Sequence, residues 1–302
     1  MKRAELQRLL EERGLAPLAR LGQHFLLDPG LLEAIPRDAG VKTGERVLEV
    51  GPGTGRLTAR LRAAGARVLA VEVDHGLCAL LREQWSACGE SDGGEGPPAE
   101  LVEGDILAAG ERLHPQVEAW WAAGPPPRIV ANLPYLISGP FLGRLPGRPL
   151  AGALLLLQRE LAEKVAADRG GSNRGPLSIR LTLSFRVSLG RRVPPEAFWP
   201  RPRVESSFLR LEPREDGLTQ AQDRLLAGLL QEAFRQRRKK LFPRLEETAP
   251  EACRALRDAG VPEKARPEDL EPEAWRLALE ALLSQGLPSG PLFPPGGKRA
   301  GG

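Results

Sequence analysis

Hydrophobic residues in the first half of the chain gather in short runs, and the segments between these runs have helical spacing. Between the first two runs, Leu57 and Leu61 fall on one face of a helix, and a second helical segment, 75–85, follows the next run. Short buried runs that alternate with helices are typical of a mainly parallel sheet covered on both faces, so the pattern predicts an α/β fold with a doubly wound sheet. The expected strands are 46–51, 67–74, 101–107, 128–133 and 152–158.

The second half of the chain changes character. The run 177–193 predicts a helix that leads into a strand, and 205–213 predicts a last strand at the sheet edge. From about Arg214 the hydrophobic spacing is helical throughout, which predicts a separate all-helical domain. A polar stretch rich in Gly and Pro, 91–98, is expected to be a surface loop. The predicted domains are 1–213 with an N-terminal helical arm stopped by Gly14, a helical domain 214–286, and a disordered tail 287–302.

Composition and charge place the chain among ordinary globular proteins. It has 302 residues, of which 41% are hydrophobic and 27% charged, with a net charge of +4. Its three cysteines, Cys78, Cys88 and Cys253, form no C-x-x-C pair, so neither a disulfide framework nor a zinc site is expected. No stretch is apolar and long enough for export or for crossing a membrane. The expected location is the cytoplasm.

A glycine-rich turn, EVGPGTG, ends the first strand and begins a helix. Gly51 and Gly53 allow the backbone to come close to a ligand, and the amino end of a helix follows. The fingerprint of nicotinamide dinucleotide enzymes requires glycine where this chain has Arg56, so a dehydrogenase is disfavoured. Taken alone, the turn is equally compatible with a structural role without ligand.

Acidic residues end the next two strands. Glu72 lies about 20 residues beyond the glycines, where a carboxylate can hold a ribose diol, and Asp74 is its close competitor. Asp105 ends the following strand, where it can accept a hydrogen bond from an adenine amino group. Each carboxylate alone is also typical of a turn or a helix cap. The succession of glycine loop, Glu72 and Asp105 at three strand ends nevertheless favours an adenosine-bearing cofactor.

The fourth strand ends in Asn132, Leu133, Pro134 and Tyr135, the last of which is the only tyrosine of the chain. The exocyclic amine of adenine is a poor nucleophile because its lone pair is delocalised into the ring. If the Asn132 amide oxygen and the Leu133 carbonyl accept its two N–H bonds, the nitrogen can turn its lone pair toward an electrophile. Tyr135 would stack on the extruded base. The alternative is that Pro134 merely ends the strand and that Tyr135 belongs to the core.

With these motifs in order, the chain resembles the S-adenosylmethionine-dependent adenine dimethyltransferases of small-subunit ribosomal RNA. The resemblance runs from about Leu21 to beyond Arg238 and includes GQHFLLDP, EVGPGTGRLT, VEVD, EGDIL, NLPYLIS and EAFRQRRKKL. It implies a Rossmann-like methyltransferase sheet with a smaller all-helical C-terminal domain. It also implies dimethylation of the exocyclic amines of two adjacent adenines in 16S ribosomal RNA during ribosome maturation.

The resemblance also implies roles for individual residues. Phe198 matches an aromatic residue expected near the target base, opposite Tyr135. The chain departs from the family at His24, where Asn is usual and where either side chain can bind the cofactor carboxylate, and at Arg174 and Lys240. Pro243 is a further departure and is expected to end the RNA-facing helix. The implied contacts of S-adenosylmethionine are His24, Leu26, Gly51, Glu72, Asp105 and Asn132.

Two basic clusters are candidates for contacts with RNA phosphates. One cluster lies near Phe198 and the other lies on and after the predicted helix that begins near 218. Such clusters position a nucleic acid without reading its sequence, although a charge run is often only a solvated face. The clusters consist of Arg191, Arg192, Arg201 and Arg203, and of Arg235, Arg237, Arg238, Lys239, Lys240 and Arg244.

Other chemistries lack the residues they need. The three histidines are far apart in the sequence, so no metal site is expected, and neither a hydrolase elbow nor a phosphate-binding loop motif is present. Two alternatives remain open beside small-subunit adenine dimethylation. One is a large-subunit methyltransferase of the macrolide-resistance type, and the other is a non-catalytic RNA-binding assembly factor. The expected partner is ribosomal RNA, and the expected protein state is a monomer.

Overall fold

The computed structural model describes residues 3–87, 97–108, 112–166, 174–236 and 239–284. The expected tail 287–302 and most of the expected loop 91–98 therefore lie outside the described residues. The chain divides into two compact units, each built from several segments. Unit 1 comprises Met1–Arg144, Pro149–Glu163 and Val187–Pro213, and unit 2 comprises Leu145–Arg148, Lys164–Arg186 and Arg214–Gly302.

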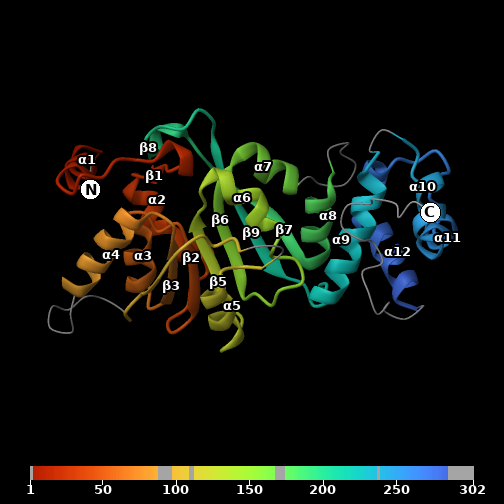
Figure 1. The fold of residues 1–302 in the computed structure, drawn as a ribbon, viewed down its shortest axis with the longest axis horizontal. Helices are drawn as coiled ribbons and strands as arrows, with labels where there is room; N and C mark the ends of the chain where they lie inside the picture. Colours follow the sequence, from red (N-terminus) through yellow and green to blue (C-terminus); the bar gives the residue numbers. More distant parts are fainter. Residues whose placement is uncertain (1–2, 88–96, 109–111, 167–173, 237–238, 285–302) are drawn as a thin grey trace, which may run out of the picture. The chain divides into compact units, whose positions relative to one another are not determined.

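Unit 1 is built around a seven-stranded sheet in the order β4-β3-β2-β5-β6-β9-β7 (Figure 1). The first five strands in this order run parallel to their neighbours, and β9 is antiparallel to β6. The predicted doubly wound α/β fold is thereby confirmed. The strands are β2 (Arg46–Val50), β3 (Arg67–Glu72), β4 (Glu100–Glu103), β5 (Arg128–Asn132), β6 (Gly152–Gln158), β7 (Phe185–Val193) and β9 (Ser206–Pro213).

The prediction that 205–213 forms the edge of the sheet is wrong. This segment is β9, which lies between β6 and β7, so that β7 occupies the edge. Phe208 and Leu209 of β9 are buried, whereas β7 is exposed along most of its length. Helix α8, which precedes β7, groups with unit 2 and not with the first predicted domain, 1–213.

Helices cover both faces of the sheet. Leu32 of α2 and Leu61 of α3 pack with Val47 and Val68 on one face. Leu48, which points to the opposite face, is also fully buried, as the run of apolar residues in β2 predicts. The helices of unit 1 are α1 (Arg3–Glu11), α2 (Pro29–Ala39), α3 (Arg56–Ala63), α4 (His75–Ala87), α5 (Pro115–Ala122), α6 (Tyr135–Leu142) and α7 (Arg159–Val165).

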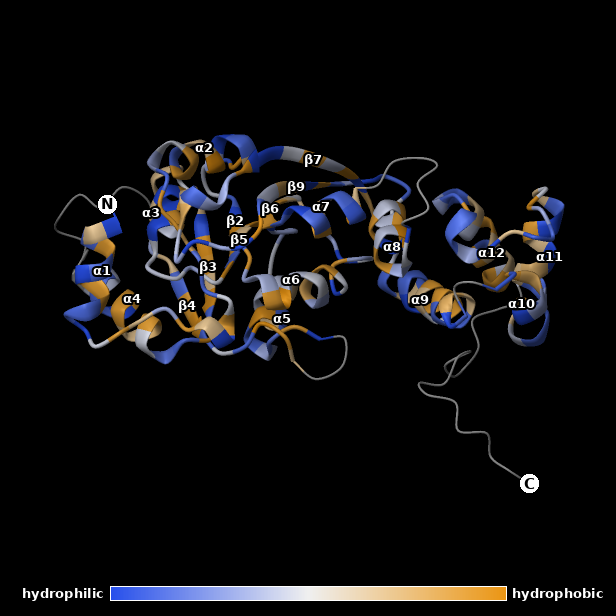
Figure 2. Cartoon of the chain, turned by 90° about the horizontal axis from the view of Figure 1, so that it is seen from above, coloured by the Kyte–Doolittle hydropathy of each residue, from blue (hydrophilic) through white to orange (hydrophobic). Residues whose placement is uncertain are grey.

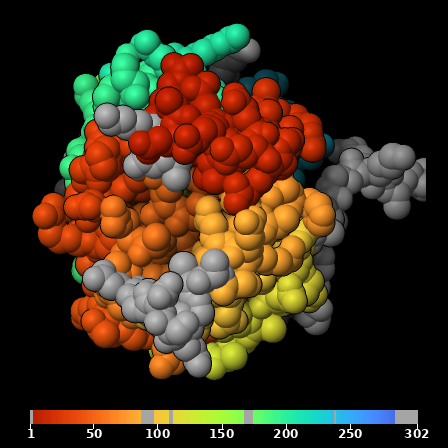
Figure 3. Space-filling model, turned by 90° about the vertical axis from the view of Figure 1, so that its left-hand side faces the viewer, coloured from red at the N-terminus to blue at the C-terminus, as the bar shows by residue number. Residues whose placement is uncertain are grey.

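The N-terminal arm packs against helix α4. Leu6 and Leu10 of α1 are buried in a cluster with Leu77 and Leu80 of α4. Figure 3 shows the red N-terminal segment lying directly against the orange surface of this region. The helix gives way to a left-handed Gly14, at φ +65°, as the sequence predicts.

Unit 2 contains a helical core of its own, and the helical character predicted from Arg214 onward is confirmed. Figure 2 shows hydrophobic residues along α9, where Leu226 and Leu229 are fully buried together with Trp275. Thr219 caps this helix, since its hydroxyl accepts from the Gln222 backbone N–H at 3.3 Å. The helices are α8 (Pro176–Ser184), α9 (Gln220–Phe234), α10 (Phe242–Thr248), α11 (Pro250–Asp258) and α12 (Pro272–Ser284).

Two sequence departures have structural explanations in unit 2. Pro243 does not end the helix that carries the basic residues, because α9 ends at Phe234 and Pro243 lies in the first turn of α10. Proline is tolerated there because the N–H it lacks has no partner within the helix. Arg174 is buried and forms an ion pair of 2.8 Å with Glu271 just before α12.

Among the described residues, no helix is long and apolar enough to span a membrane.

Candidate active site

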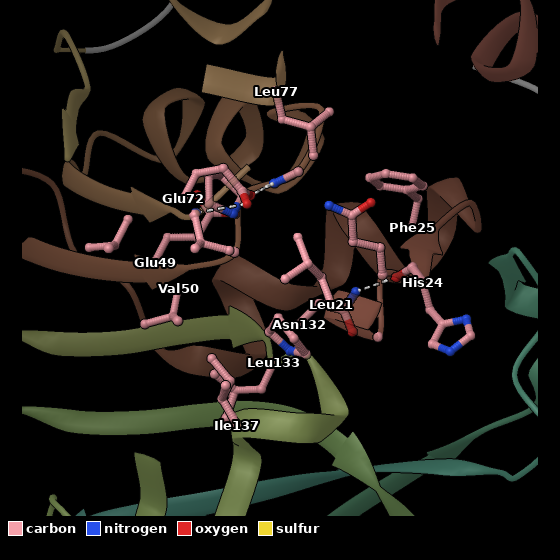
Figure 4. A pocket seen from close by; sticks show the side chains of 18 of the residues that line it. Leu21, His24, Phe25, Glu49, Val50, Glu72, Leu77, Asn132, Leu133 and Ile137 are labelled. Atoms are coloured by element: carbon pink, nitrogen blue, oxygen red, sulfur yellow. Dashed lines mark hydrogen bonds between the residues drawn. The ribbon is translucent and has the colours of Figure 1, made fainter. Parts of the chain in front are cut away.

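A pocket lies where the parallel strands end at their carboxyl edge (Figure 4). The ends of β2, β3 and β5 and the turn after β4 contribute to its lining, as does the segment around His24 that precedes β1 (Phe25–Leu26). This is the edge at which ligands bind in doubly wound sheets. The pocket brings together the predicted residues His24, Leu26, Gly51, Gly53, Glu72, Asp105, Asn132, Leu133, Pro134 and Tyr135.

The glycine-rich turn forms one wall of the pocket and is in close contact with its neighbours. Gly51 has φ +69°, and a Cβ added there would lie 3.1 Å from the ring of Pro134. A Cβ on Gly53, at φ +60°, would lie 3.0 Å from the ring of Phe25. Both glycines are therefore required by backbone conformation and by space. They place backbone, rather than side chains, on the wall of the pocket.

Glu72 is the acidic residue that faces the pocket. Its carboxylate accepts backbone N–H groups of Gly53 at 3.1 Å and of Val73 and Asp74 at 3.0 Å. The residue is only 4% exposed. Burial raises the pKa of this carboxyl above its ordinary value, and the backbone hydrogen bonds act in the opposite direction. The N–H groups fix the side chain as a hydrogen-bond acceptor at the end of β3.

Asp74, its competitor in the sequence, has a different role. One carboxylate oxygen of Asp74 accepts the backbone N–H groups of Gly76 and Leu77 at the start of α4. The other oxygen accepts from the Gln23 side chain at 2.8 Å. Asp74 does not line the pocket, so the helix-cap interpretation applies to this residue and not to Glu72.

Glu49 is a pocket residue that the sequence reasoning did not single out. It is 1% exposed, and its carboxylate accepts the Thr58 hydroxyl at 2.6 Å. The pKa of Glu49 is raised to about 8, mainly by burial. The Thr58 hydrogen bond acts against this rise, and the charge of the nearby Glu72 adds to it. An acidic residue inside an otherwise hydrophobic strand was the available signal. Asp105, by contrast, is exposed at the pocket and also accepts the Leu107 backbone N–H at 2.9 Å.

Asn132 is oriented by a contact with a segment distant in the sequence. Its side-chain nitrogen donates to the backbone carbonyl of His24 at 2.9 Å, which leaves the amide oxygen as the atom available to an incoming donor. The next residue, Leu133, donates its backbone N–H to Leu156 at 2.9 Å and so continues the sheet ladder. The end of β5 is therefore held rigidly at the pocket.

Tyr135 lines the pocket and is only partly buried, so it is not a residue of the hydrophobic core. Its hydroxyl forms a hydrogen bond of 2.6 Å with the Ser206 hydroxyl, and its ring centroid lies 5.2 Å from that of His24. Burial raises the pKa of Tyr135, and the Ser206 hydrogen bond opposes that rise. The tyrosine therefore presents a neutral aromatic ring in a fixed position.

The His24 side chain is turned away from Glu72 in Figure 4. Its Nδ1 lies 2.7 Å from the carbonyl oxygen of Pro200, which can only accept a hydrogen bond. The Nδ1 atom therefore carries a proton and donates it to this carbonyl. What His24 brings to Asn132 is its backbone carbonyl, while its ring packs beside Tyr135.

The structure does not place Phe198 in the pocket opposite Tyr135. Phe198 is 3% exposed and packs in the core with Val193 and Phe208. It lies in β8 (Phe198–Trp199), which pairs with β1, and neighbouring strand residues point to opposite sides. The side chain of Phe198 is therefore part of the core and does not line the pocket in this structure.

The basic cluster near Phe198 is largely neutralised by acidic neighbours. Three of its four arginines form ion pairs within unit 1, whereas Arg203 is exposed and forms no ion pair with any residue of the described segments. The pairs are Arg191 with Asp38, Arg192 with Glu163 and Arg201 with Glu196.

The cluster after α9 is divided in a similar way. Arg235 and Arg244 both pair with Glu232, the former at 3.8 Å. Lys239 and Lys240 are exposed and form no ion pair with a described residue. The expected RNA contacts Arg237 and Arg238 lie outside the described residues.

Comparison with known proteins identifies the family. The sequence model of the family described as ribosomal RNA adenine dimethylase matches residues 18–282. A ribosomal RNA small subunit methyltransferase A of Synechococcus sp. (strain JA-3-3Ab) is 38% identical over 287 residues, which cover 90% of this chain and 95% of that relative. A protein of the same name from Magnetococcus marinus is 36% identical and covers 87% of this chain and 90% of its own length.

Solved structures agree with this fold. A dimethyladenosine transferase from Plasmodium falciparum superposes with a TM-score of 0.66 at 24% identity, covering 87% of this chain and 99% of that one. The 23S rRNA methyltransferase ErmE superposes with a TM-score of 0.62 at 27% identity, covering 85% of this chain and 99% of that one. Given the family match over 18–282 and the relatives that align along nearly their whole length, the chain belongs to the ribosomal RNA adenine dimethylase family.

Proposed function

We propose that this protein transfers methyl groups from S-adenosylmethionine to the exocyclic amines of adenines in small-subunit ribosomal RNA, dimethylating two adjacent adenines during ribosome maturation. The family membership and the 38% identity to small-subunit methyltransferases support this proposal. The observation that carries it is Asn132, which lines the pocket and whose amide oxygen is left available because its nitrogen donates to the His24 carbonyl.

The pocket fits the cofactor. When bound, S-adenosylmethionine supplies a methyl group activated on a sulfonium. Glu72 would accept the ribose hydroxyls, and Asp105 would accept the adenine amino group, because both carboxylates line the pocket at successive strand ends. A Cβ on Gly51 or Gly53 would reach Pro134 or Phe25, so only glycines leave the backbone approachable there. His24 and Leu26 would contribute from the opposite wall.

The target adenine would be held at the end of β5. Its amine donates to the Asn132 amide oxygen and the Leu133 carbonyl, which localises the nitrogen lone pair toward the methyl group. Pro134 fixes the backbone that carries these acceptors, and Tyr135 stacks on the base. Catalysis then comes from the alignment of the reacting atoms, and the proton of the product ammonium passes to water.

Of the RNA contacts predicted from the two basic clusters, Arg203, Lys239 and Lys240 form no ion pair with a described residue and would bind phosphate first. Arg201 and Arg235 would have to exchange an acidic partner for phosphate. The proposal extends to a cytoplasmic monomer whose partner is the small ribosomal subunit. Relatives named as small-subunit methyltransferases support the ribosomal partner, and the free buried thiols Cys78 and Cys253 support the cytoplasmic location.

A large-subunit substrate is the second candidate, favoured by the 27% identity and the TM-score of 0.62 to a 23S rRNA methyltransferase. Higher identity over more of the chain favours the small subunit.

The test is methyl transfer from labelled S-adenosylmethionine to undermethylated small subunits, to large subunits and to naked RNA. Asn132→Ala is expected to abolish labelling, and Gln116→Ala, which removes an exposed amide on α5, serves as the matched control. Label on adenines of the small subunit, lost in Asn132→Ala only, would support the proposal. Label confined to the large subunit would establish the second candidate. Cofactor binding without methyl transfer to any substrate would instead favour a non-catalytic RNA-binding factor.

A further inference from the structure

Two arginines line the pocket, and they differ in what their guanidinium groups contact. Arg56 is partly buried and donates to the backbone carbonyls of Leu26 and Leu27 at 2.8 and 3.3 Å. Arg20 is exposed, and it makes no hydrogen bond or ion pair through its side chain with any residue that the structure describes. Arg20 is thus a cation at the pocket whose charge remains available to a ligand.

The segment that carries Arg20 is held in place on both sides. It forms a single 3-10 turn, Ala19–Leu21, closed by the Gly22 N–H, which donates to Ala19 at 3.0 Å. Next to the turn, the Gln23 side chain accepts the Leu18 N–H at 2.8 Å and donates to Asp74 at 2.8 Å. These bonds tie the turn to the start of α4, so Arg20 is presented from a defined backbone.

The same turn touches the first residues of α6. A Cβ added to Gly22 would lie 3.5 Å from the side chain of Leu136 and 3.7 Å from the backbone nitrogen of Tyr135. Leu136 also lines the pocket and is 62% exposed, the most exposed of the large hydrophobic residues described. A free cation, an exposed apolar side chain and an aromatic ring therefore lie close together. This combination is typical of surfaces that bind a nucleotide through its phosphate and its base.

The distribution of charge within the pocket determines where a phosphate can bind. Glu49, Glu72 and Asp105 supply carboxyl groups at the ends of β2, β3 and β4, where an anion is disfavoured. A nucleotide whose base reaches Asn132 and Tyr135 keeps its phosphates outside the pocket, because base and phosphate are joined through the sugar. Of the two arginines that line the pocket, Arg20 is the one whose guanidinium has no partner among the described residues.

We propose that Arg20 binds a phosphate of the target nucleotide and that Leu136 packs against its sugar or a neighbouring base. This inference rests on the proposed function and deepens it, since it assigns a substrate contact outside both basic clusters of the sequence. Arg20 is a binding residue in this assignment and takes no part in the methyl transfer itself.

The test uses the full chain and measures two affinities separately. The first is the affinity for undermethylated small subunits at several salt concentrations without cofactor, and the second is the affinity for S-adenosylmethionine without RNA. Arg20→Gln is expected to weaken subunit binding about tenfold and to reduce the salt slope by about one. Arg20→Lys should retain most of the affinity. Arg8→Gln removes an arginine that is 77% exposed on α1 and outside the pocket, and it should behave as wild type.

Leu136→Ala provides a second variant. It is expected to weaken subunit binding with an unchanged salt slope, because no charge is removed. Unchanged subunit binding in Arg20→Gln would overturn the inference, and so would a loss of S-adenosylmethionine affinity with unchanged subunit binding, which would assign Arg20 to the cofactor carboxylate. If subunit binding depends on Arg20 but the wild type transfers no methyl group to adenine, the proposed function fails, whereas the contact between Arg20 and an RNA phosphate is still supported.

Discussion

Single side chains at the pocket are fixed by partners from other segments of the chain. The Asn132 amide is oriented by the His24 carbonyl, and the Tyr135 hydroxyl by Ser206. No local pattern in NLPY determines these contacts. The residue types could be predicted from the sequence, but their orientation depends on segments more than 70 positions away.

The orientation of Asn132 leads to a prediction for an isosteric change. Asn132→Asp keeps the size of the side chain, but it loses the N–H that His24 accepts and places a carboxylate oxygen near a carbonyl oxygen. We expect methyl transfer to fall by about two orders of magnitude or more, since the acceptor is no longer held in place. Single-turnover rates with saturating cofactor would measure this, and a variant with wild-type rates would show that the His24 contact has no role.

Glu49 should make stability depend on pH. Its folded pKa of about 8 is above the ordinary value of 4.5, so the folded state holds a proton that the unfolded state releases. The stabilisation is complete below pH 4.5 and is lost as the pH rises through about 8. Glu49→Gln imitates the protonated form and cannot lose this contribution, which amounts to about 5 kcal/mol at most.

The measurement is the unfolding free energy of wild type and Glu49→Gln between pH 6 and pH 9. The unfolding free energy of the variant should rise relative to that of the wild type up to about pH 8 and then level off. A difference that stays constant over this range would mean that Glu49 is ionised in the folded protein throughout.

At the scale of elements, the strands and helices themselves could be predicted from the sequence better than the elements they pair with or pack against. The expected strand 128–133 corresponds to β5, Arg128–Asn132, because a short apolar run with a proline after it has few alternatives. The positions of Phe198 and Pro243 differ from the prediction for another reason. Which side of β8 faces the core depends on its pairing with β1, and where α9 ends depends on the packing of unit 2.

The glycine turn offers a prediction at this scale. Gly51→Ala imposes φ +69° on an L-residue and brings Cβ within 3.1 Å of the Pro134 ring. Gly40→Ala imposes nearly the same φ, +68°, at the end of α2, but its Cβ would meet nothing within 4 Å. Both variants should lose about 1 kcal/mol or more of stability to the backbone conformation.

Only Gly51→Ala should also lower the affinity for S-adenosylmethionine, by about tenfold or more, because Pro134 must move to make room for the added Cβ. Thermal unfolding and equilibrium binding of the cofactor separate the two effects. Equal cofactor affinities in Gly51→Ala and Gly40→Ala would show that the close approach of Gly51 to Pro134 is not needed for cofactor binding.

For the whole molecule, RNA binding depends less on the number of basic residues than on which of them are already paired with acidic residues. A net charge of +4 arises from 43 basic and 39 acidic residues, so most cations can find an acidic neighbour. The sequence locates the clusters near Phe198 and after α9, but it does not reveal that Asp38, Glu196 and Glu232 are already engaged with them. That information depends on the fold.

Pairing leads to opposite predictions for two double variants. Lys239→Gln with Lys240→Gln removes two exposed cations without an ion pair among the described residues, so RNA affinity should fall and the salt slope should decrease by about two, with unchanged thermal stability. Arg191→Gln with Arg192→Gln removes partners of Asp38 and Glu163, so the salt slope should change by less than about one. Binding of undermethylated small subunits over a salt series would measure both. Equal slopes in the two variants would mean that phosphate displaces the acidic partners freely, and the count of basic residues would then predict RNA binding after all.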